Sequence, residues 1–199
     1  MLQVVVGDLP EPGSGQVRIK VLAAGVSAYD LMHRRSGSLP GSPALPYNAG
    51  RGRRGRGGQV GSGGVNRRGG SDGCRLSRGG GYTESICLPA GELVPVPAGL
   101  DPAEAVCLVA NYLTAHLMLH ETAGIKPGER ILVYGAAGSV GSALLQLGKV
   151  AGLEMYGTAS KYNHELVSAL GATPIDYHIV NLVDFCDVLH RLCRYCRLH

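Results

Sequence analysis

The stretch 130-RILVYGAAGSVGSALLQLGKVAG-152 passes from a short apolar run through a glycine-rich turn into an amphipathic segment. The run Arg130–Tyr134 predicts a short apolar strand. The apolar residues of Ser142–Ala151 recur at helical spacing, and Gly152 ends the predicted helix. Between the two, Gly135–Gly141 predicts a tight turn. A strand, a glycine turn and a helix in this order are typical of a dinucleotide-binding unit when a second strand follows.

The residues that follow continue this alternation of strands and helices. Leu153–Gly157 and Thr173–Tyr177 predict short strands, and Lys161–Leu170 predicts a helix that Gly171 ends. With the first strand and helix they predict the order β-α-β-α-β, which is the first half of a doubly wound parallel sheet. The tail after Asn181 again carries apolar residues at helical spacing.

Three glycines in the turn match what a pyrophosphate site requires. Gly135 allows a tight turn out of the strand, Gly138 leaves room for a phosphate near the backbone, and Gly141 lets helix and strand pack closely. The helix start then offers free N–H groups and the positive end of its dipole to the phosphates. The alternative is a glycine turn in an α/β fold that binds nothing.

The end of the second predicted strand bears on which dinucleotide would bind. An NAD site usually places Asp or Glu there, to accept hydrogen bonds from the ribose hydroxyls. This chain has Thr158-Ala159-Ser160-Lys161 instead, which offers a hydroxyl and a cation but no carboxylate. These residues favour NADP(H), whose 2′-phosphate would be attracted. The alternative is that Lys161 is an ordinary solvated residue at a helix start.

The N-terminal half is predicted to be rich in strands. Gln16–Gly25 alternates apolar and charged residues, which predicts a half-buried strand, and Tyr82–Pro97 predicts short strands broken by prolines. A helix should then follow Asp101 as its cap, with Pro102 at the first position and Glu104 three residues after the cap. The residues expected to supply its apolar bulk are Val106, Leu108, Ala110, Leu113, Leu117 and Leu119.

An arginine- and glycine-rich tract interrupts this half. Residues 51–80 show neither helical nor strand periodicity. They hold eight arginines, one aspartate and no lysine or glutamate, so the net charge of +4 is local to them and the rest of the chain is acidic. No aromatic residue is interleaved to stack on bases, so we expect only non-specific, salt-sensitive contact with nucleic acid through Arg51–Arg78. An RGG-like RNA-binding segment is the alternative.

Composition and cysteine usage narrow the class of protein. No uncharged apolar run approaches the roughly 20 residues that a membrane span needs, and no secretory signal is recognised at the start. The six cysteines show no regular framework, so we expect a cytoplasmic protein with free thiols. One helix cannot aim four ligands spaced by three at a single ion, so we expect no metal site in the tail. These four residues are His190, Cys193, Cys196 and His199.

Several segments together resemble the zinc-free quinone oxidoreductases of the medium-chain dehydrogenase/reductase superfamily. They are 111-NYLTAHLML-119, 126-KPGERILVYGAAGSVGSALLQLGKVAG-152, 156-YGTASK-161 and 170-LGATPIDY-177. In addition, 17-VRIKVLAAGVSAYDLMHR-34 resembles the GroES-like N-terminal domain of that family. The resemblance implies an α/β protein with a GroES-like β-rich domain over residues 1–100, including the arginine- and glycine-rich part at 49–80. A partial Rossmann sheet, doubly wound and parallel, would follow over residues 101–199.

This resemblance implies an NADPH-dependent oxidoreductase that passes hydride to a quinone or enone, works without zinc or a catalytic acid or base, and forms a homodimer. Ser27 stands where the family often has Asn. Carried over by position, the pyrophosphate would be held by Gly135, Gly138, Val140 and Gly141. Ser160 and Lys161 would meet the 2′-phosphate with Tyr177 nearby, and Asn111 and Thr114 would lie toward the nicotinamide.

The resemblance also predicts what the chain lacks. Further strands of the family's sheet have no counterpart before residue 199, so we expect low stability and little turnover. A non-catalytic remnant is therefore an alternative to a working reductase. The tract at residues 51–80 takes the place of valine-rich strands in the family. Valine-rich codons read out of frame would encode Arg and Gly, so a frameshifted segment is our hypothesis.

Overall fold

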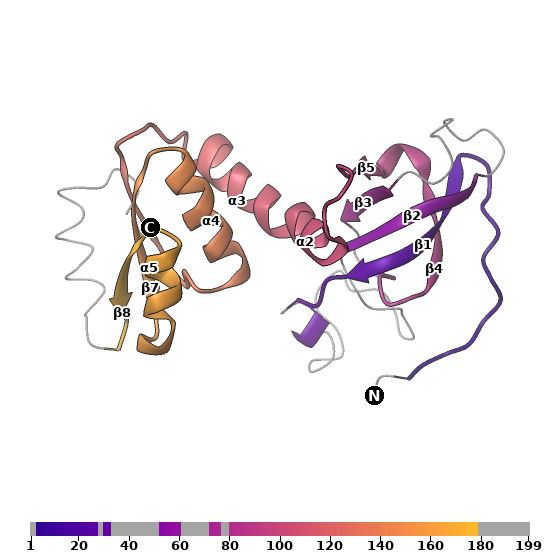
Figure 1. Cartoon of the computed structure of the whole chain (residues 1–199), viewed down its shortest axis with the longest axis horizontal. Helices are drawn as coiled ribbons and strands as arrows, with labels where there is room; N and C mark the ends of the chain where they lie inside the picture. The colour runs from indigo at the N-terminus through magenta and orange to yellow at the C-terminus, as the bar shows by residue number, and fades with distance from the viewer. Residues whose placement is uncertain (1–2, 28–29, 33–51, 61–71, 77–79, 179–199) are drawn as a thin grey trace. The chain divides into compact units, whose positions relative to one another are not determined.

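The structure of the chain, a computed structural model, describes residues 3–27, 30–32, 52–60, 72–76 and 80–178. The chain divides into two compact units, Met1–Ala110 (unit 1) and Asn111–His199 (unit 2) (Figure 1). Unit 1 is built on an antiparallel sheet and unit 2 on a parallel sheet, which confirms the expected fold class. Within the described ranges no helix is long and apolar enough to cross a membrane, and no cysteine forms a disulfide.

In the described part of unit 1, five strands form one sheet in the order β4-β1-β2-β3-β5. Each neighbouring pair runs antiparallel. A 3-10 turn, η1 (Ala90–Glu92), joins β4 to β5. The strands are β1 (Gln16–Ala24), β2 (Gly52–Val60), β3 (Asp72–Leu76), β4 (Ser85–Pro89) and β5 (Val94–Pro95).

The alternation predicted for the first strand is confirmed in β1. Val17 and Ile19 on one face of the strand are buried, whereas Lys20 on the opposite face is exposed. A strand turns successive side chains to opposite faces, so one face enters the core and the other meets solvent. The buried residues of this core are Val17, Ile19, Leu88, Ala90 and Leu93.

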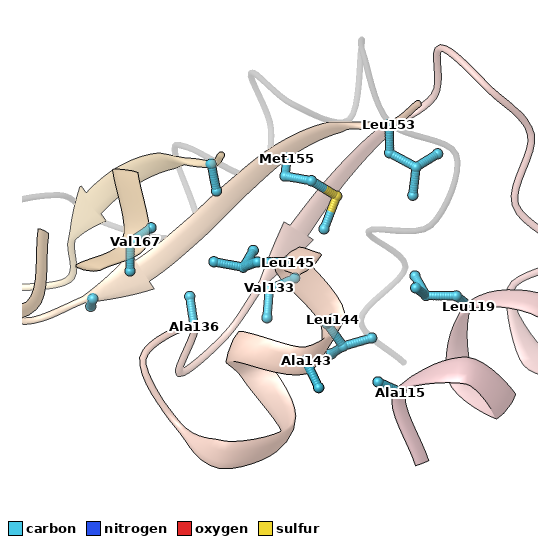
Figure 2. Packing of buried hydrophobic residues seen from close by; sticks show 12 residues of the cluster. Ala115, Leu119, Val133, Ala136, Ala143, Leu144, Leu145, Leu153, Met155 and Val167 are labelled. Atoms are coloured by element: carbon cyan, nitrogen blue, oxygen red, sulfur yellow. The ribbon is translucent and has the colours of Figure 1, made fainter. Parts of the chain in front are cut away.

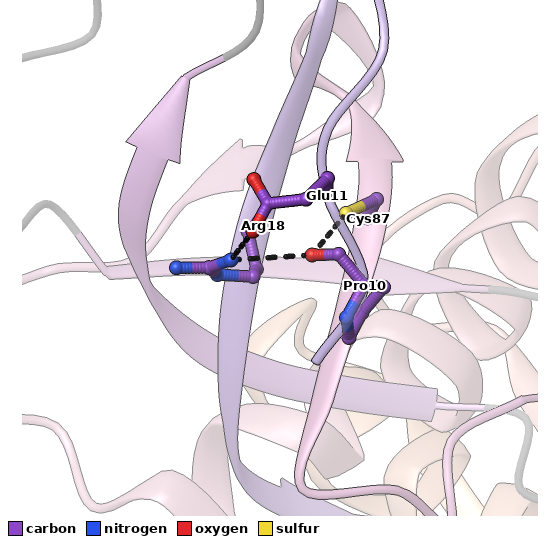
Figure 3. Close-up of polar contacts among 4 residues, drawn as sticks. All are labelled: Pro10, Glu11, Arg18 and Cys87. Carbon is purple, nitrogen blue, oxygen red and sulfur yellow. Dashed lines mark hydrogen bonds and ion pairs between the residues drawn. The ribbon is translucent and has the colours of Figure 1, made fainter. Parts of the chain in front are cut away.

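Polar contacts tie the N-terminal segment to this sheet (Figure 3). From β1, Arg18 Nη1 donates to Glu11 Oε1 at 3.0 Å and to the Pro10 carbonyl at 3.3 Å. The same carbonyl accepts a hydrogen bond from Cys87 Sγ of β4 at 3.4 Å. Burial raises the pKa of the Cys87 thiol, an effect that the positive charge of Arg18 opposes. The thiol is therefore held as a neutral donor.

The arginine- and glycine-rich tract contains two strands, β2 and β3, although its sequence shows no strand periodicity. β2 pairs with β1 on one side and with β3 on the other, in a ladder of backbone groups. Side-chain periodicity is not required for this pairing, because arginine and glycine carry the same backbone donor and acceptor as other residues. Residues 51, 61–71 and 77–79 of the tract lie outside the described residues.

The helix predicted after Asp101 begins where expected. Asp101 is the N-cap of α2 (Pro102–Cys107), and its carboxylate accepts from the N–H groups of Ala103 at 2.8 Å and Glu104 at 3.2 Å. Pro102 occupies the first turn, where its missing N–H costs nothing. Helical structure continues as η2 (Leu108–Tyr112), α3 (Leu113–His116) and η3 (Leu117–Thr122), of which η2 and η3 are π-helical. The sequence did not predict these wider turns.

Unit 2 has the predicted β-α-β-α-β order. In its described part, three parallel strands lie in the order β6-β7-β8. These are β6 (Arg130–Val133), β7 (Glu154–Ala159) and β8 (Thr173–Asp176), with α4 (Ser139–Val150) after β6 and η4 (Lys161–Asn163) and α5 (His164–Ala169) after β7. The tail whose helical spacing was noted after Asn181 lies outside the described residues.

The core of unit 2 lies between the sheet and its helices (Figure 2). Leu145 of α4 and Val167 of α5 are fully buried above Val133 of β6 and Met155 of β7. Gly157 of β7 leaves no room for a side chain, because an added Cβ would lie 2.5 Å from Ala136 Cβ and 3.1 Å from Val167 Cγ1. The helices therefore pack directly on the strand backbone.

Only part of the apolar bulk expected in the helical stretch is buried. Ala115 and Leu119 join the core of unit 2, and Figure 2 shows both beside α4. Of the residues expected to supply apolar bulk, Val106 and Leu119 are buried, whereas Leu108, Leu113 and Leu117 are 43%, 48% and 45% exposed. A helix that packs along one side buries only the residues of that side.

Candidate functional site

The turn between β6 and α4 is tight and is held by the end of β7. Gly135 has φ of 64°, a left-handed conformation that side chains rarely adopt. The N–H of Gly138 donates to the Gly135 carbonyl at 2.9 Å. The N–H groups of Gly135 and Ala136 donate to the hydroxyl and the carbonyl of Thr158, both at 3.0 Å. Two adjacent strands thus fix the path of the turn.

Thr158 is a positioning residue that sequence reasoning missed. The expectation treated 158-TASK-161 as one group that offers a hydroxyl to a phosphate. The Thr158 side chain is only 3% exposed and its hydroxyl accepts from Gly135, so Thr158 supports the turn instead. A polar residue inside an otherwise buried strand was the available signal, because buried polar groups are normally hydrogen-bonded.

The backbone of the glycine turn lies closest to α4 at Gly141, in the first helical turn. A Cβ added at Gly141 would lie 2.3 Å from the Gly135 carbonyl oxygen and 2.9 Å from Ala136 Cα. Both contacts are with backbone, which cannot rotate away. A Cβ added at Gly138 would meet only the Gly135 carbonyl oxygen, at 3.1 Å. The close packing predicted for Gly141 is therefore present.

α4 begins one turn earlier than predicted, at Ser139 instead of Ser142. Gly138 is the N-cap, with extended backbone at φ −76° and ψ 171°, and its carbonyl accepts the N–H of Ser142 at 2.8 Å. This bond closes the first turn and brings Val140 and Gly141 into the helix. No side chain caps this end, and no acidic residue lies in the first turn.

The uncapped end of α4 has the properties of an anion site. The first N–H groups of a helix lack intrahelical partners, and the helix dipole places partial positive charge there. In α4 these are the groups of Ser139, Val140 and Gly141, next to an exposed glycine turn. Phosphate oxygens are acceptors of suitable charge for such a position.

The carboxyl ends of the three parallel strands meet at the same edge of the sheet. Val133 of β6 pairs with Gly157 of β7, and Ala159 of β7 pairs with Asp176 of β8. Ser160 and Lys161 follow β7 directly, and Tyr177 follows β8. The structure thus places the glycine turn and the three residues predicted to meet the 2′-phosphate along the carboxyl edge of this sheet.

Ser160, Lys161 and Tyr177 keep groups that a ligand could reach. The Ser160 hydroxyl accepts from Asn163 Nδ2 at 3.1 Å and retains its own proton to donate. The Lys161 side chain is exposed, and Tyr177 is 45% exposed with its ring 4.3 Å from that of His178. The nearby Asp176 carboxylate accepts the N–H of His178 at 2.9 Å.

The two residues expected near a nicotinamide belong to the helical stretch at the start of unit 2. Asn111 in η2 is half-buried and Thr114 in α3 is exposed. Between them, Tyr112 donates its hydroxyl proton to Gln146 Oε1 of α4 at 2.8 Å, which links this stretch to α4. In unit 1 the Ser27 hydroxyl donates to Asp30 Oδ2 at 2.8 Å, so Ser27 is engaged in a local turn.

In the described part of unit 2, the side chains with shifted pKa values lie toward the other end of the strands. Hydrogen bonds from Tyr156 and from Arg130 lower the pKa of the Glu154 carboxyl. Arg130 and Glu154 pair across the amino ends of β6 and β7, and their ion pair is 2.6 Å long. Within the described ranges, no group of three or more His, Cys, Asp or Glu side chains could hold a metal ion. The carboxyl edge of the sheet presents backbone N–H groups at the start of α4, the Ser160 hydroxyl and the Lys161 ammonium.

Comparisons with known proteins agree with this geometry. No family model matches the chain. It is 38% identical over 177 residues to the synaptic vesicle membrane protein VAT-1 homolog of Rattus norvegicus, which covers 88% of this chain and 44% of that protein. It is 36% identical over 172 residues to the quinone oxidoreductase of Rattus norvegicus, with 85% and 52% covered. The chain thus spans about half the length of these relatives.

Solved structures show the same similarity. The Escherichia coli quinone oxidoreductase complexed with NADPH superimposes with a TM-score of 0.86 at 25% identity, covering 94% of this chain and 58% of that one. A Pseudomonas syringae quinone oxidoreductase gives 0.84 at 29% identity, with 94% and 57% covered. The homologues of this chain are thus VAT-1 homologs and quinone oxidoreductases, and its structural neighbours include quinone oxidoreductases of the medium-chain dehydrogenase/reductase superfamily.

Proposed function

We propose that unit 2 binds NADP(H) across the carboxyl edge of β6, β7 and β8, with the pyrophosphate at the start of α4. The observation that carries the proposal is the uncapped end of α4 packed against the Gly135 turn. A side chain at Gly141 would fill the space in which turn and helix meet, so the glycines form a cradle of bare backbone. The similar Escherichia coli quinone oxidoreductase is complexed with NADPH, which supports this choice of ligand.

Each part of the dinucleotide has a proposed set of contacts. The pyrophosphate would lie against Gly135, Gly138, Val140 and Gly141. Val140 and Gly141 would donate their backbone N–H groups to it, and Gly135 and Gly138 would leave room for it beside the backbone. Ser160 would donate its hydroxyl proton to the 2′-phosphate, and the Lys161 ammonium would neutralise its charge, with Tyr177 beside them. Asn111 and Thr114 would lie toward the nicotinamide.

We extend the proposal to NADPH-dependent reduction of a small quinone or enone without zinc, by a homodimer of the family type. When bound, NADPH supplies the hydride, so the protein needs to orient the cofactor more than to provide an acid or base. The residues of the turn and of α4 would fix the cofactor's position. The chain spans about half of its relatives, so turnover is a separate question from binding.

Titration of the full chain with NADPH and with NADH tests the binding proposal. We expect saturable enhancement of nicotinamide fluorescence, with tighter binding of NADPH. Lys161→Ala should weaken NADPH roughly three- to tenfold, about 0.7–1.4 kcal/mol, because an exposed charge pair contributes modestly, and should leave NADH unchanged. Lys126→Ala is the matched control, since Lys126 is an exposed lysine that precedes the amino end of β6.

Three outcomes would contradict parts of the proposal. Absence of saturable binding to either nucleotide would refute the dinucleotide site. Equal affinity for NADPH and NADH would refute the 2′-phosphate contacts while leaving the pyrophosphate site in place. Binding without reduction of a quinone or enone would favour a non-catalytic remnant over a reductase.

A further inference from the structure

His116 and His120 form a pair of exposed imidazoles outside the proposed nucleotide site. His116 is the last residue of α3 and His120 lies in η3, four residues later. Their ring centroids are 4.5 Å apart and their planes differ by 43°. Both side chains are exposed, so solvent and ions reach them.

Packing on the other side of the helix holds this pair in place. Ala115 and Leu119, each one residue earlier, are 0% and 3% exposed in the core beside α4 (Figure 2). This contact fixes the rotation of the helix about its axis, and the next residue along lies roughly a quarter of a turn further round. His116 and His120 are therefore presented to solvent together, on a backbone that the core keeps rigid.

The chemistry of two such rings favours a transition metal. A neutral imidazole keeps one ring nitrogen with a free lone pair, and nitrogen ligands suit Zn²⁺, Cu²⁺, Ni²⁺ and Co²⁺ better than Mg²⁺ or Ca²⁺. Two histidines four residues apart on a helix can reach one ion, as in the helical zinc motifs of metalloproteases. In the described part of the chain no third His, Cys, Asp or Glu completes a cluster with them. Water would fill the remaining positions.

We propose that His116 and His120 chelate one divalent transition-metal ion on the solvent side of the α3–η3 helix. The ion bridges two consecutive turns and binds the folded helix better than the unfolded chain, so it stabilises unit 2. The proposal is independent of nucleotide binding.

Thermal unfolding of the full chain with added Ni²⁺ tests the chelate. Ni²⁺ is the probe because it does not oxidise free cysteines as Cu²⁺ does. We expect Ni²⁺ to raise Tm at lower concentration than Co²⁺, following the usual affinity order, and Mg²⁺ to have no effect. His116→Asn and His120→Asn should each weaken Ni²⁺ binding at least about tenfold, since each removes a ligand. The double variant should lose no more Ni²⁺ affinity than either single variant, because one substitution already breaks the chelate.

Two controls distinguish Ni²⁺ binding at His116 and His120 from Ni²⁺ binding at other histidines and cysteines of the chain. His178→Asn is the control, because His178 is another exposed histidine of unit 2. The histidines and cysteines after residue 189 stay unchanged in all variants, so only the difference between variants is assigned to the pair. In the unaltered protein, Ni²⁺ should slow modification of His116 and His120 by diethylpyrocarbonate together and leave His178 reactive.

An unchanged Ni²⁺ effect in either single variant would overturn the proposal. So would losses that simply add in the double variant, because they would indicate two separate monodentate contacts. Equal protection of His178 by Ni²⁺ would also refute the pair as the binding site.

Discussion

Replacing Gly141 by alanine should destabilise unit 2 despite placing a better helix former in α4. The new Cβ would lie 2.3 Å from the Gly135 carbonyl oxygen, whereas ordinary contacts of a Cβ are 3.4–4 Å. The neighbouring atoms of Ala136, at 2.9 and 3.0 Å, are also backbone. Relief therefore requires the turn and the helix to separate by about an ångström at a point held by Thr158.

The magnitude follows from two opposing terms. Overpacking of this kind typically costs about 1–3 kcal/mol, and more where backbone must move. Replacing glycine by alanine inside a helix recovers up to about 1 kcal/mol. We expect a net loss of about 2 kcal/mol in the free energy of unfolding.

Gly148→Ala provides the matched control in the same helix. Its Cβ would meet Met155 Sδ at 2.5 Å and Met155 Cε at 2.8 Å, which are atoms at the end of a flexible side chain. Met155 can change rotamer, so the helix-propensity gain should offset most of the cost and leave stability within about 1 kcal/mol of the parent.

Urea unfolding followed by far-UV circular dichroism compares the two variants. Both lie in unit 2, so both should shift the same transition, and the difference in midpoint times the common slope gives the free-energy difference. Unchanged stability of Gly141→Ala, or a larger loss in Gly148→Ala, would refute the argument from backbone contact.

Further predictions concern a helix cap, a buried hydroxyl and a thiol. Asp101→Ala should lower stability by about 1 kcal/mol in urea unfolding, while Asp101→Asn should lose little, because asparagine also caps; equal losses would contradict capping. Thr158→Val should cost about 1 kcal/mol, since it removes the hydrogen bond that the N–H of Gly135 donates to the Thr158 hydroxyl, and Thr158→Ser should restore most of it. Burial raises the pKa of Cys87, so iodoacetamide at pH 8 should modify exposed Cys107 first in peptide maps; faster labelling of Cys87 would refute its shielding.

Local patterns in the sequence predicted much of the fold. Val17 and Ile19 alternate with charged residues, and one face of β1 is buried as that pattern requires. Asp101 followed by Pro102 located the start of α2 to the residue. These signals succeed because strand alternation and helix capping depend on residues close together in the chain.

The start of α4 shows where such local signals end. Three glycines in Gly135–Gly141 predicted a turn throughout, but the helix begins at Ser139. Glycine has low helix propensity, yet at Gly141 close packing against the turn requires it inside the helix. The conflict between propensity and packing is resolved only by contacts with residues of the turn.

By itself the sequence determined the order of strands and helices in unit 2, the glycine turn and the residues available at the carboxyl edge. The tertiary structure alone decided that part of the arginine- and glycine-rich tract pairs with β1, because backbone hydrogen bonds leave no side-chain pattern to read. It also decided that the Thr158 hydroxyl supports Gly135, and that His116 lies against His120 in solvent. The first two depend on which distant residues meet, and the orientation of the histidine pair depends on how its helix packs on the core.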